Sequence, residues 1–144
     1  MGRRSRRDAV RPTVILVDTS AWIEFLRDTG SRTCNAVGRL LDTELACCDV
    51  ISMELLAGAR DDAHLTALRG LVARTTVLPL GPTDYDDAAS LYRTCRRNGG
   101  TVRNLTDCLI AAVAMREHVP LLHADRDFAR IAQHAPLVLH RSSS

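Results

Sequence analysis

Three observations predict an α/β domain, with a mostly parallel sheet between two layers of helices. Short apolar runs rich in β-branched residues alternate with helical patterns along the 144 residues. Acidic residues lie just after two of these runs, where functional groups gather in parallel sheets. Hydrophobic residues make up 46% and charged residues 25%, the balance of one globular domain. We therefore expect a single three-layer domain over residues 13–140.

The first half of the chain supplies two strands. The run TVILV is apolar and β-branched, which is typical of a buried strand, and Gly residues stop the helical patterns that follow. The elements expected here are a strand over 13–17, a helix from about Ser20 to Gly30, a helix over about 32–42, a strand over 45–48, and a helix capped by Asp49 that ends at Gly58.

The second half supplies two or three more strands. Pro and Gly residues interrupt its apolar runs, and Asn98-Gly99-Gly100 is its clearest loop. The elements expected are a helix from Asp61 or Asp62 through Val72, a strand over 76–80, a helix from Thr83 to about Arg97, a helix opened by Asn104, a strand over 120–123, a helix from Asp125 through Ile131, and a possible fifth strand over 137–139.

Basic charge is concentrated at the N-terminus, and all nineteen basic residues are Arg. Residues 1–11 carry five Arg against Asp8, a local charge of +4, so the rest of the +2 chain sums to −2. Bulk charge therefore does not identify a nucleic-acid binder. We expect residues 1–12 to be a disordered basic tail, either solvated or in auxiliary contact with RNA or DNA. Alternatively, residues 1–13 belong to an upstream start, with natural initiation at Val14.

The five cysteines predict reduced thiols in the core of a cytoplasmic protein. Their number is odd, and the sequence has neither a C-x-x-C pair nor a Cys/His spacing suited to zinc. The apolar stretch 14–17 is too short for a signal peptide or a membrane span. Five aromatic residues are too few for a surface that stacks bases of single strands.

Four acidic residues are expected at one rim of the sheet. Asp18 follows the first strand and Asp125 follows the fourth. Asp107 lies in the first turn of the helix after the Gly-rich loop, and Glu54 lies inside the helix after the second strand. Each also has a simpler interpretation, because Asp18 and Asp125 could be helix caps, Asp107 could form a capping box with Asn104, and Glu54 could be a surface charge.

Such a cluster of carboxylates calls for a cation. Each pair would repel by about 4 kcal/mol at roughly 4 Å and an effective dielectric constant near 20. Oxygen ligands select hard cations such as Mg²⁺ or Mn²⁺ rather than zinc. The chemistry served by this arrangement is phosphodiester hydrolysis.

Four blocks, in order and at suitable spacing, resemble the PIN-domain ribonucleases of the VapC toxin type. They are VILVDTSAWIE at 14–24, MELLAG at 53–58, TVRNLTDCLIAA at 101–112 and HADRDF at 123–128. The resemblance covers about Val14 to Leu139 and implies the PIN three-layer α/β/α sandwich. In relatives the first strand begins almost at the initiator Met, whereas twelve or thirteen residues precede it here.

The resemblance also implies roles for individual residues. Asp18, Glu54, Asp107 and Asp125 match the acidic metal-site positions of the family. Thr19 and Ser20 match a hydroxyl pair that could orient the first carboxylate or a metal-bound water, although Ser20 could instead cap its helix. Asp127 is expected as a supporting or substitute ligand. His123 stands where many relatives have Thr, and a histidine at a strand end is more often structural than a general base.

By resemblance, the protein is expected to be an endoribonuclease dependent on Mg²⁺, with Mn²⁺ as the alternative. Its substrate would be structured RNA, commonly tRNA and sometimes ribosomal RNA. A homodimer and a cognate VapB-type antitoxin are implied, in a heterotetramer or larger complex, with an antitoxin Arg that pairs with the carboxylates. RNA phosphates would meet arginines on the rim, unless these are only solvated surface; the candidates are Arg103, Arg126, Arg96 and Arg97.

Three rival classes can be compared with this prediction. A phosphorylated receiver domain and a haloacid-type phosphatase are also α/β proteins with an acidic pocket, but each would call for a lysine near the phosphate. This chain contains no Lys, which excludes any mechanism that needs one. The remaining alternative is a non-catalytic PIN-like interaction module that only binds antitoxin or metal, and the presence of all four acids argues against it.

Overall fold

Four parallel strands form one sheet in a computed structural model that describes residues 14–144. The expectations for the basic tail lie outside these described residues. The strand order is β3-β2-β1-β4, and the strands are β1 (Ile15–Val17), β2 (Leu45–Cys48), β3 (Thr76–Leu78) and β4 (Leu121–Leu122). Leu16 lies in the central part of the sheet, where it pairs with Ala46 of β2 on one side and with Leu121 of β4 on the other.

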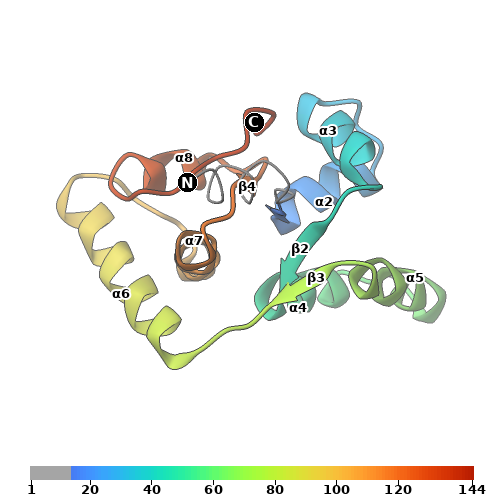
Figure 1. The fold of residues 1–144 in the computed structure, drawn as a ribbon, viewed down its shortest axis with the longest axis horizontal. Coiled ribbons are helices and arrows are strands. Elements are labelled where there is room, and N and C mark those ends of the chain that lie inside the picture. Colours follow the sequence, from blue (N-terminus) through green and yellow to red (C-terminus); the bar gives the residue numbers. More distant parts are fainter. Residues whose placement is uncertain (1–13) are drawn as a thin grey trace, which may run out of the picture.

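Seven helices surround the sheet in the described part of the chain. They are α2 (Thr19–Leu26), α3 (Arg32–Leu40), α4 (Asp49–Ala57), α5 (Asp62–Ala73), α6 (Pro82–Arg97), α7 (Leu105–Glu117) and α8 (Arg126–Ala132). The chain steps from β1 to β2 to β3 in one direction and then crosses back to β4. Right-handed crossovers place α2 to α5 on one face and α6 with α7 on the other. Figure 1 shows α6 and α7 together, away from α2, α3 and α5, while α4 contacts α7. The predicted three-layer α/β/α fold is confirmed.

The hydrophobic core is built from the strands, from α7 and from the inner faces of the other helices that pack on the sheet. Leu16, Val17 and Ala46 are fully buried in the central strands. Eight consecutive residues of α7, from Asp107 to Ala114, are buried, so this helix is enclosed on all sides rather than amphipathic. Asp107 is therefore buried because it belongs to this otherwise apolar buried segment of α7.

All five cysteines are buried free thiols, in agreement with the sequence prediction. Burial raises the pKa of Cys47 and of Cys108 to about 12. These thiols remain protonated at neutral pH and act as small apolar core groups.

Several predicted boundaries are wrong. The N-cap of α4 is Cys48, and Asp49 lies in the first turn, where its charge suits the helix dipole. α6 begins at Pro82 rather than Thr83, because the fixed φ of proline fits the first helical position. β3 ends at Leu78, before Pro79, which lacks the N–H that a sheet ladder needs.

The segment after α8 contributes a single bridge instead of a fifth strand. Leu139 pairs in parallel with Leu121, and the Leu121 N–H donates to the Val138 carbonyl at 2.9 Å. The terminal serines pack onto the domain: the Thr33 hydroxyl donates to the Ser142 carbonyl at 3.0 Å. Between residues 14 and 144, none of the helices has the length and apolar character needed to cross a bilayer.

Candidate metal centre

The four predicted acids reach the carboxyl edge of the sheet by different routes. Asp18 directly follows β1 and is the N-cap of α2. Asp125 is the third residue after β4 and is the N-cap of α8. Asp107 lies in the first turn of α7, and Glu54 lies within α4. Two of the acids are therefore helix caps and members of this edge at the same time.

Asp107, Asp125 and Asp127 form the tightest group, which we call the acidic cluster. One carboxylate oxygen from each lies within 4.8 Å of the others. Asp18 and Glu54 lie outside this trio, but both are close enough for their charges to raise the pKa of Asp107. The sequence predicted Asp127 as a supporting or substitute ligand, after the other four acids. The signal for its place was the spacing Asp125-x-Asp127 at the start of a helix.

Asp107 has an unsatisfied buried oxygen. The side chain is 6% exposed, and Oδ2 has no hydrogen-bond partner among residues 14–144. The capping box with Asn104 does not form, because the Asn104 side chain makes no capping hydrogen bond. Burial, followed by the charges of Asp18 and Asp125, raises the pKa of Asp107 from 3.8 to about 8. An ionised Asp107 therefore needs a cation as its partner.

Asp18 is held by Ser20. Asp18 Oδ2 accepts hydrogen bonds from the Ser20 N–H at 2.9 Å and from its hydroxyl at 2.5 Å. The Ser20 Oγ in turn accepts the Ala124 N–H at 2.9 Å, which ties the end of β1 to the segment after β4. Burial raises the pKa of Asp18 to about 6, against the opposing effect of the Ser20 bonds. The interpretation of Ser20 as N-cap is wrong, because the extended backbone of Asp18 already starts the helix.

The second hydroxyl of the pair orients Glu54. The Thr19 Oγ1 donates to Glu54 Oε1 at 2.7 Å and thereby joins α2 to α4. Both side chains are half-buried. Glu54 is thus a fixed carboxylate beside the other acids rather than a solvated surface charge.

Asp127 anchors two arginines. It is fully buried, and its Oδ2 accepts from the backbone N–H and the Nε of Arg103 at 3.1 and 3.2 Å. Arg130 Nη1 lies 3.5 Å from Asp127 Oδ1. Arg103 also donates from Nη2 to Asp125 at 2.9 Å. Sequence reasoning missed Arg130, although its position one helical turn after Asp127 could have identified it.

The other predicted arginines lie on the surface. Arg126 is exposed at the first position of α8. Arg96 and Arg97 are exposed at the end of α6, where the Arg96 guanidinium lies 5.9 Å from the centre of the Tyr92 ring.

His123 has the surroundings of a structural residue. Its ring is buried and packs against Phe128 with centroids 5.2 Å apart. Nδ1 accepts the Asp125 N–H at 3.2 Å, which helps to fix the acid at the start of α8. Burial lowers the pKa of His123, so the ring is neutral near pH 7.

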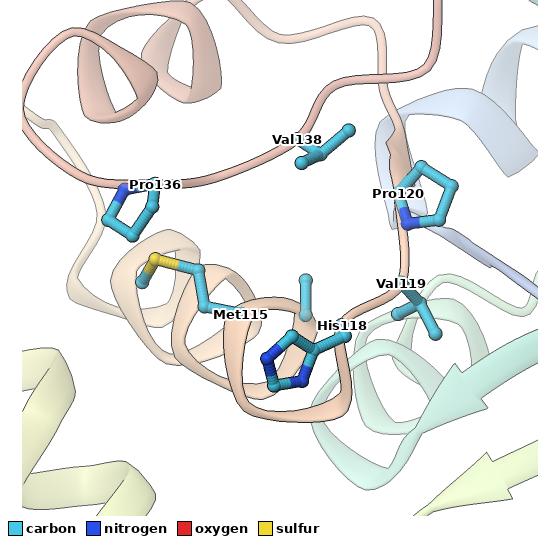
Figure 2. A pocket seen from close by; sticks show the side chains of 7 residues that line it. Met115, His118, Val119, Pro120, Pro136 and Val138 are labelled. Atoms are coloured by element: carbon cyan, nitrogen blue, oxygen red, sulfur yellow. The ribbon is translucent and has the colours of Figure 1, made fainter. Parts of the chain in front are cut away.

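A separate apolar cavity lies at the opposite end of α7. It has a volume of about 150 Å³ and is lined by Ala114, Met115, His118, Val119, Pro120, Pro136 and Val138. Figure 2 shows Met115, His118 and Val138 around it. Its position before β4, with no acid among the lining residues, separates it from the carboxylates.

The donor set fits a hard divalent cation. Every candidate ligand is a carboxylate, and carboxylate oxygens suit Mg²⁺ or Mn²⁺ better than zinc. The buried Asp107 Oδ2 supplies an acceptor that a cation would satisfy.

Comparisons with known proteins agree with this geometry. The sequence matches the family profile of the PIN domain over residues 15–133. Ribonuclease VapC11 of Mycobacterium tuberculosis (strain ATCC 25618 / H37Rv) is 46% identical over 124 residues, which cover 83% of this chain and 92% of that protein.

Solved structures share the fold at lower identity. VapBC2 from Rickettsia felis, bound to a DNA fragment from its promoter, contains a chain with a TM-score of 0.72 and 16% identity, covering 89% of this chain and 98% of that one. VapBC-1 from nontypeable Haemophilus influenzae gives a TM-score of 0.72 at 20% identity, over 90% and 98% of the two chains. Sequence match, fold and acidic edge thus lead to one assignment: this chain belongs to the PIN domain family, among the VapC ribonucleases.

Proposed function

We propose that this chain is the toxin of a type II toxin-antitoxin system and acts in the cytoplasm as a metal-dependent endoribonuclease. The observation that carries the proposal is the buried Asp107 oxygen, which has no hydrogen-bond partner in the described part of the chain and lies next to Asp125 and Asp127. The charges of Asp18 and Glu54 also act on this carboxylate. The 46% identity to a protein named ribonuclease VapC11 supports the reaction class. Structured RNA is the proposed substrate, tRNA first and ribosomal RNA second.

Asp18, Glu54, Asp107 and Asp125 would hold the ion, with Asp127 in support, and Mg²⁺ is the proposed metal with Mn²⁺ as the alternative. When bound, the metal activates a water for in-line attack and neutralises charge on the phosphoryl oxygens. The chain's own hydroxyls position the ligands, because Ser20 fixes Asp18 and Thr19 fixes Glu54. The RNA phosphates would meet Arg103, Arg126, Arg96 and Arg97.

A VapB-type antitoxin is the proposed inhibitor. Solved structures with this fold are described as VapBC complexes, which supports such a partner here. An antitoxin Arg could bind the carboxylates bidentately in place of the metal. A homodimer, and a heterotetramer or larger assembly with antitoxin, complete the proposal.

The test is cleavage of total RNA by purified, antitoxin-free protein with Mg²⁺, Mn²⁺ or EDTA. We expect discrete fragments only with metal, and a loss on the order of 1,000-fold in Asp18→Asn and Asp107→Asn, since several kcal/mol of transition-state stabilisation depend on the bound ion. Asp86→Asn is the matched control, because Asp86 is an exposed acid on α6.

Cleavage in EDTA, or full activity of either site variant, would contradict the metal mechanism. Binding of metal and antitoxin without any RNA cleavage would instead favour the non-catalytic interaction module.

A further inference from the structure

A polar cavity of about 440 Å³ adjoins the acidic cluster and takes no part in it. Residues 98–101, in the loop after α6, form one wall, and Arg130, Gln133 and His134 at the end of α8 form the other. Figure 1 shows this loop leaving α6 and passing close to α8. The volume lies within the range of pockets that hold small molecules, about 300–1,000 Å³.

Arg130 connects the cavity to the acids. Its Nη1 donates to the Thr101 carbonyl at 2.8 Å, which links the two walls of the cavity. The same atom lies 3.5 Å from Asp127 Oδ1. The same segment leads within two residues to Arg103, which is bonded to Asp127 and Asp125. A ligand in the cavity would therefore lie one arginine away from the acidic cluster.

The lining favours a ligand that carries both donors and acceptors. Arg130 offers charge to a phosphate, Gln133 offers an amide, and His134 offers an imidazole ring. α6 and α8 both end here, and helix C-termini disfavour a bare anion while they attract donors such as base amino groups and ribose hydroxyls. A nucleotide combines these features, whereas inorganic phosphate does not.

Gly100 lies beside His134 in the lining of the cavity. A Cβ at this position would lie 3.6 Å from His134 Nε2 and 3.4 Å from the Cys95 carbonyl. A methyl group here would narrow the cavity without removing a polar group.

We propose that this cavity is a nucleotide subsite that takes one unstacked RNA residue next to the bond cut at the acidic cluster. The inference rests on the proposed ribonuclease function. The phosphate contacts Arg130, the base lies against the His134 ring, and the Gln133 amide hydrogen-bonds to the base edge. Unpaired bases in RNA loops are commonly bound in this way, by stacking and edge hydrogen bonds.

The experiment measures binding of unfractionated tRNA to protein carrying Asp18→Asn, which disables cleavage. In that background, the double variant Gln133→Ala/His134→Asn should weaken tRNA binding about tenfold. The single variant Gly100→Ala should also weaken tRNA binding. Neither change removes an arginine, so the slope of log affinity against log salt should stay the same. The matched control is His118→Asn in the apolar cavity, because Asn tolerates the left-handed backbone of His118 at φ 55°.

Unchanged tRNA affinity in both cavity variants, with unfolding midpoints like that of the parent, would overturn the subsite. Weakened binding of a VapB-type antitoxin with unchanged tRNA affinity would assign the cavity to a protein partner and also overturn it. A fall in the salt slope would mean that the variants disturb the arginines, which contradicts a base-binding role. Metal-dependent cleavage of total RNA by wild-type protein tests the proposed function separately, so the two ideas can fail independently.

Discussion

The two ends of α7 each lie at a buried carboxylate, but one carboxylate is bonded to an arginine and the other has an unsatisfied oxygen. At its C-terminal end, Arg116 holds Asp84 of α6, which is 1% exposed, through bonds of 2.7 Å to Oδ1 and 3.1 Å to Oδ2. The Gly81 N–H adds a third bond to Asp84 at 2.9 Å. At its N-terminal end, Asp107 is similarly buried but keeps Oδ2 without a partner among the described residues.

The pKa values follow this difference. The hydrogen bonds from Arg116 lower the pKa of Asp84 below its usual 3.8, whereas burial raises that of Asp107 to about 8. Asp84 therefore stabilises the fold as a satisfied ion pair. Asp107 costs stability whenever it ionises without a cation, which is the pattern of a group kept for function.

The largest effect on stability should come from the C-terminal end of α7, where Arg116 satisfies the Asp84 carboxylate. Arg116→Ala leaves Asp84 buried without its charge partner, and we expect the free energy of unfolding to fall by about 3 kcal/mol. Urea unfolding in EDTA measures it. Arg39→Ala, at an exposed arginine of α3, should change stability by less than about 0.5 kcal/mol. An equally small effect of Arg116→Ala would show that Asp84 is rehydrated.

Metal binding should stabilise the protein at the N-terminal end of α7, where Asp107 lies. Mn²⁺ at about 100 times its dissociation constant should raise the free energy of unfolding by about 2.7 kcal/mol, because it binds the folded state. Asp107→Asn should abolish this gain, and Asp86→Asn should retain it. If Asp107→Asn gained as much as the wild type, Asp107 would not be a ligand.

Without metal, Asp107→Asn should stabilise the fold. In EDTA at pH 8 we expect a gain of about 2 kcal/mol, because the amide removes a buried ionisable group. The folded pKa of about 8 exceeds the ordinary 3.8, so the unfolded chain loses this proton first and wild-type stability falls as pH rises through that interval. The advantage of the variant should therefore grow from pH 5 to pH 8 in urea unfolding curves.

The contribution of Asp84 to the pH dependence of stability has the opposite sign. Its lowered folded pKa means that its stabilisation is present above 3.8 and is lost as pH falls below that value. An advantage of Asp107→Asn that stayed constant from pH 5 to pH 8 would show that the folded pKa of Asp107 is not raised.

The smallest effect should come from the hydroxyls that position the acids. Thr19→Val removes the 2.7 Å hydrogen bond to Glu54 and should weaken Mn²⁺ binding about tenfold, measured by calorimetry. Thr66→Val is the matched control at an exposed position of α5, where the hydroxyl donates to the Asp62 carbonyl at 3.0 Å. Equal Mn²⁺ affinity in both variants would mean that Thr19 does not position a ligand.

Much of the acidic edge could be predicted because its signals are local. The apolar run before Asp18 indicates a buried strand, and a residue directly after a parallel strand lies at the functional edge. Capping is also local, but the sequence offered both Asp18 and Ser20 as caps. The structure separates their roles, since Asp18 caps α2 and Ser20 bonds both to Asp18 and to Ala124, which is 104 residues away.

Partners far apart in sequence could not be predicted. Arg103 and Asp127 are 24 residues apart, and Arg116 and Asp84 are 32 apart. Nothing in the local pattern distinguishes Arg116 from an ordinary solvated arginine at a helix end. The bridge at Leu139 is similar: its apolar neighbours predict a strand, yet only its place beside β4 determines how many residues pair.

By itself, the sequence determined the alternation of strands and helices and the positions of the acids after them, because hydrophobic periodicity and turn residues act over a few positions. The tertiary structure decided which of those carboxylates are satisfied. Asp84 meets a guanidinium and Asp107 meets none from residues 14–144, although both are acids in the first turn of a helix. That outcome depends on which side chains the packed layers bring within about 3 Å, and burial then turns the difference into opposite pKa shifts.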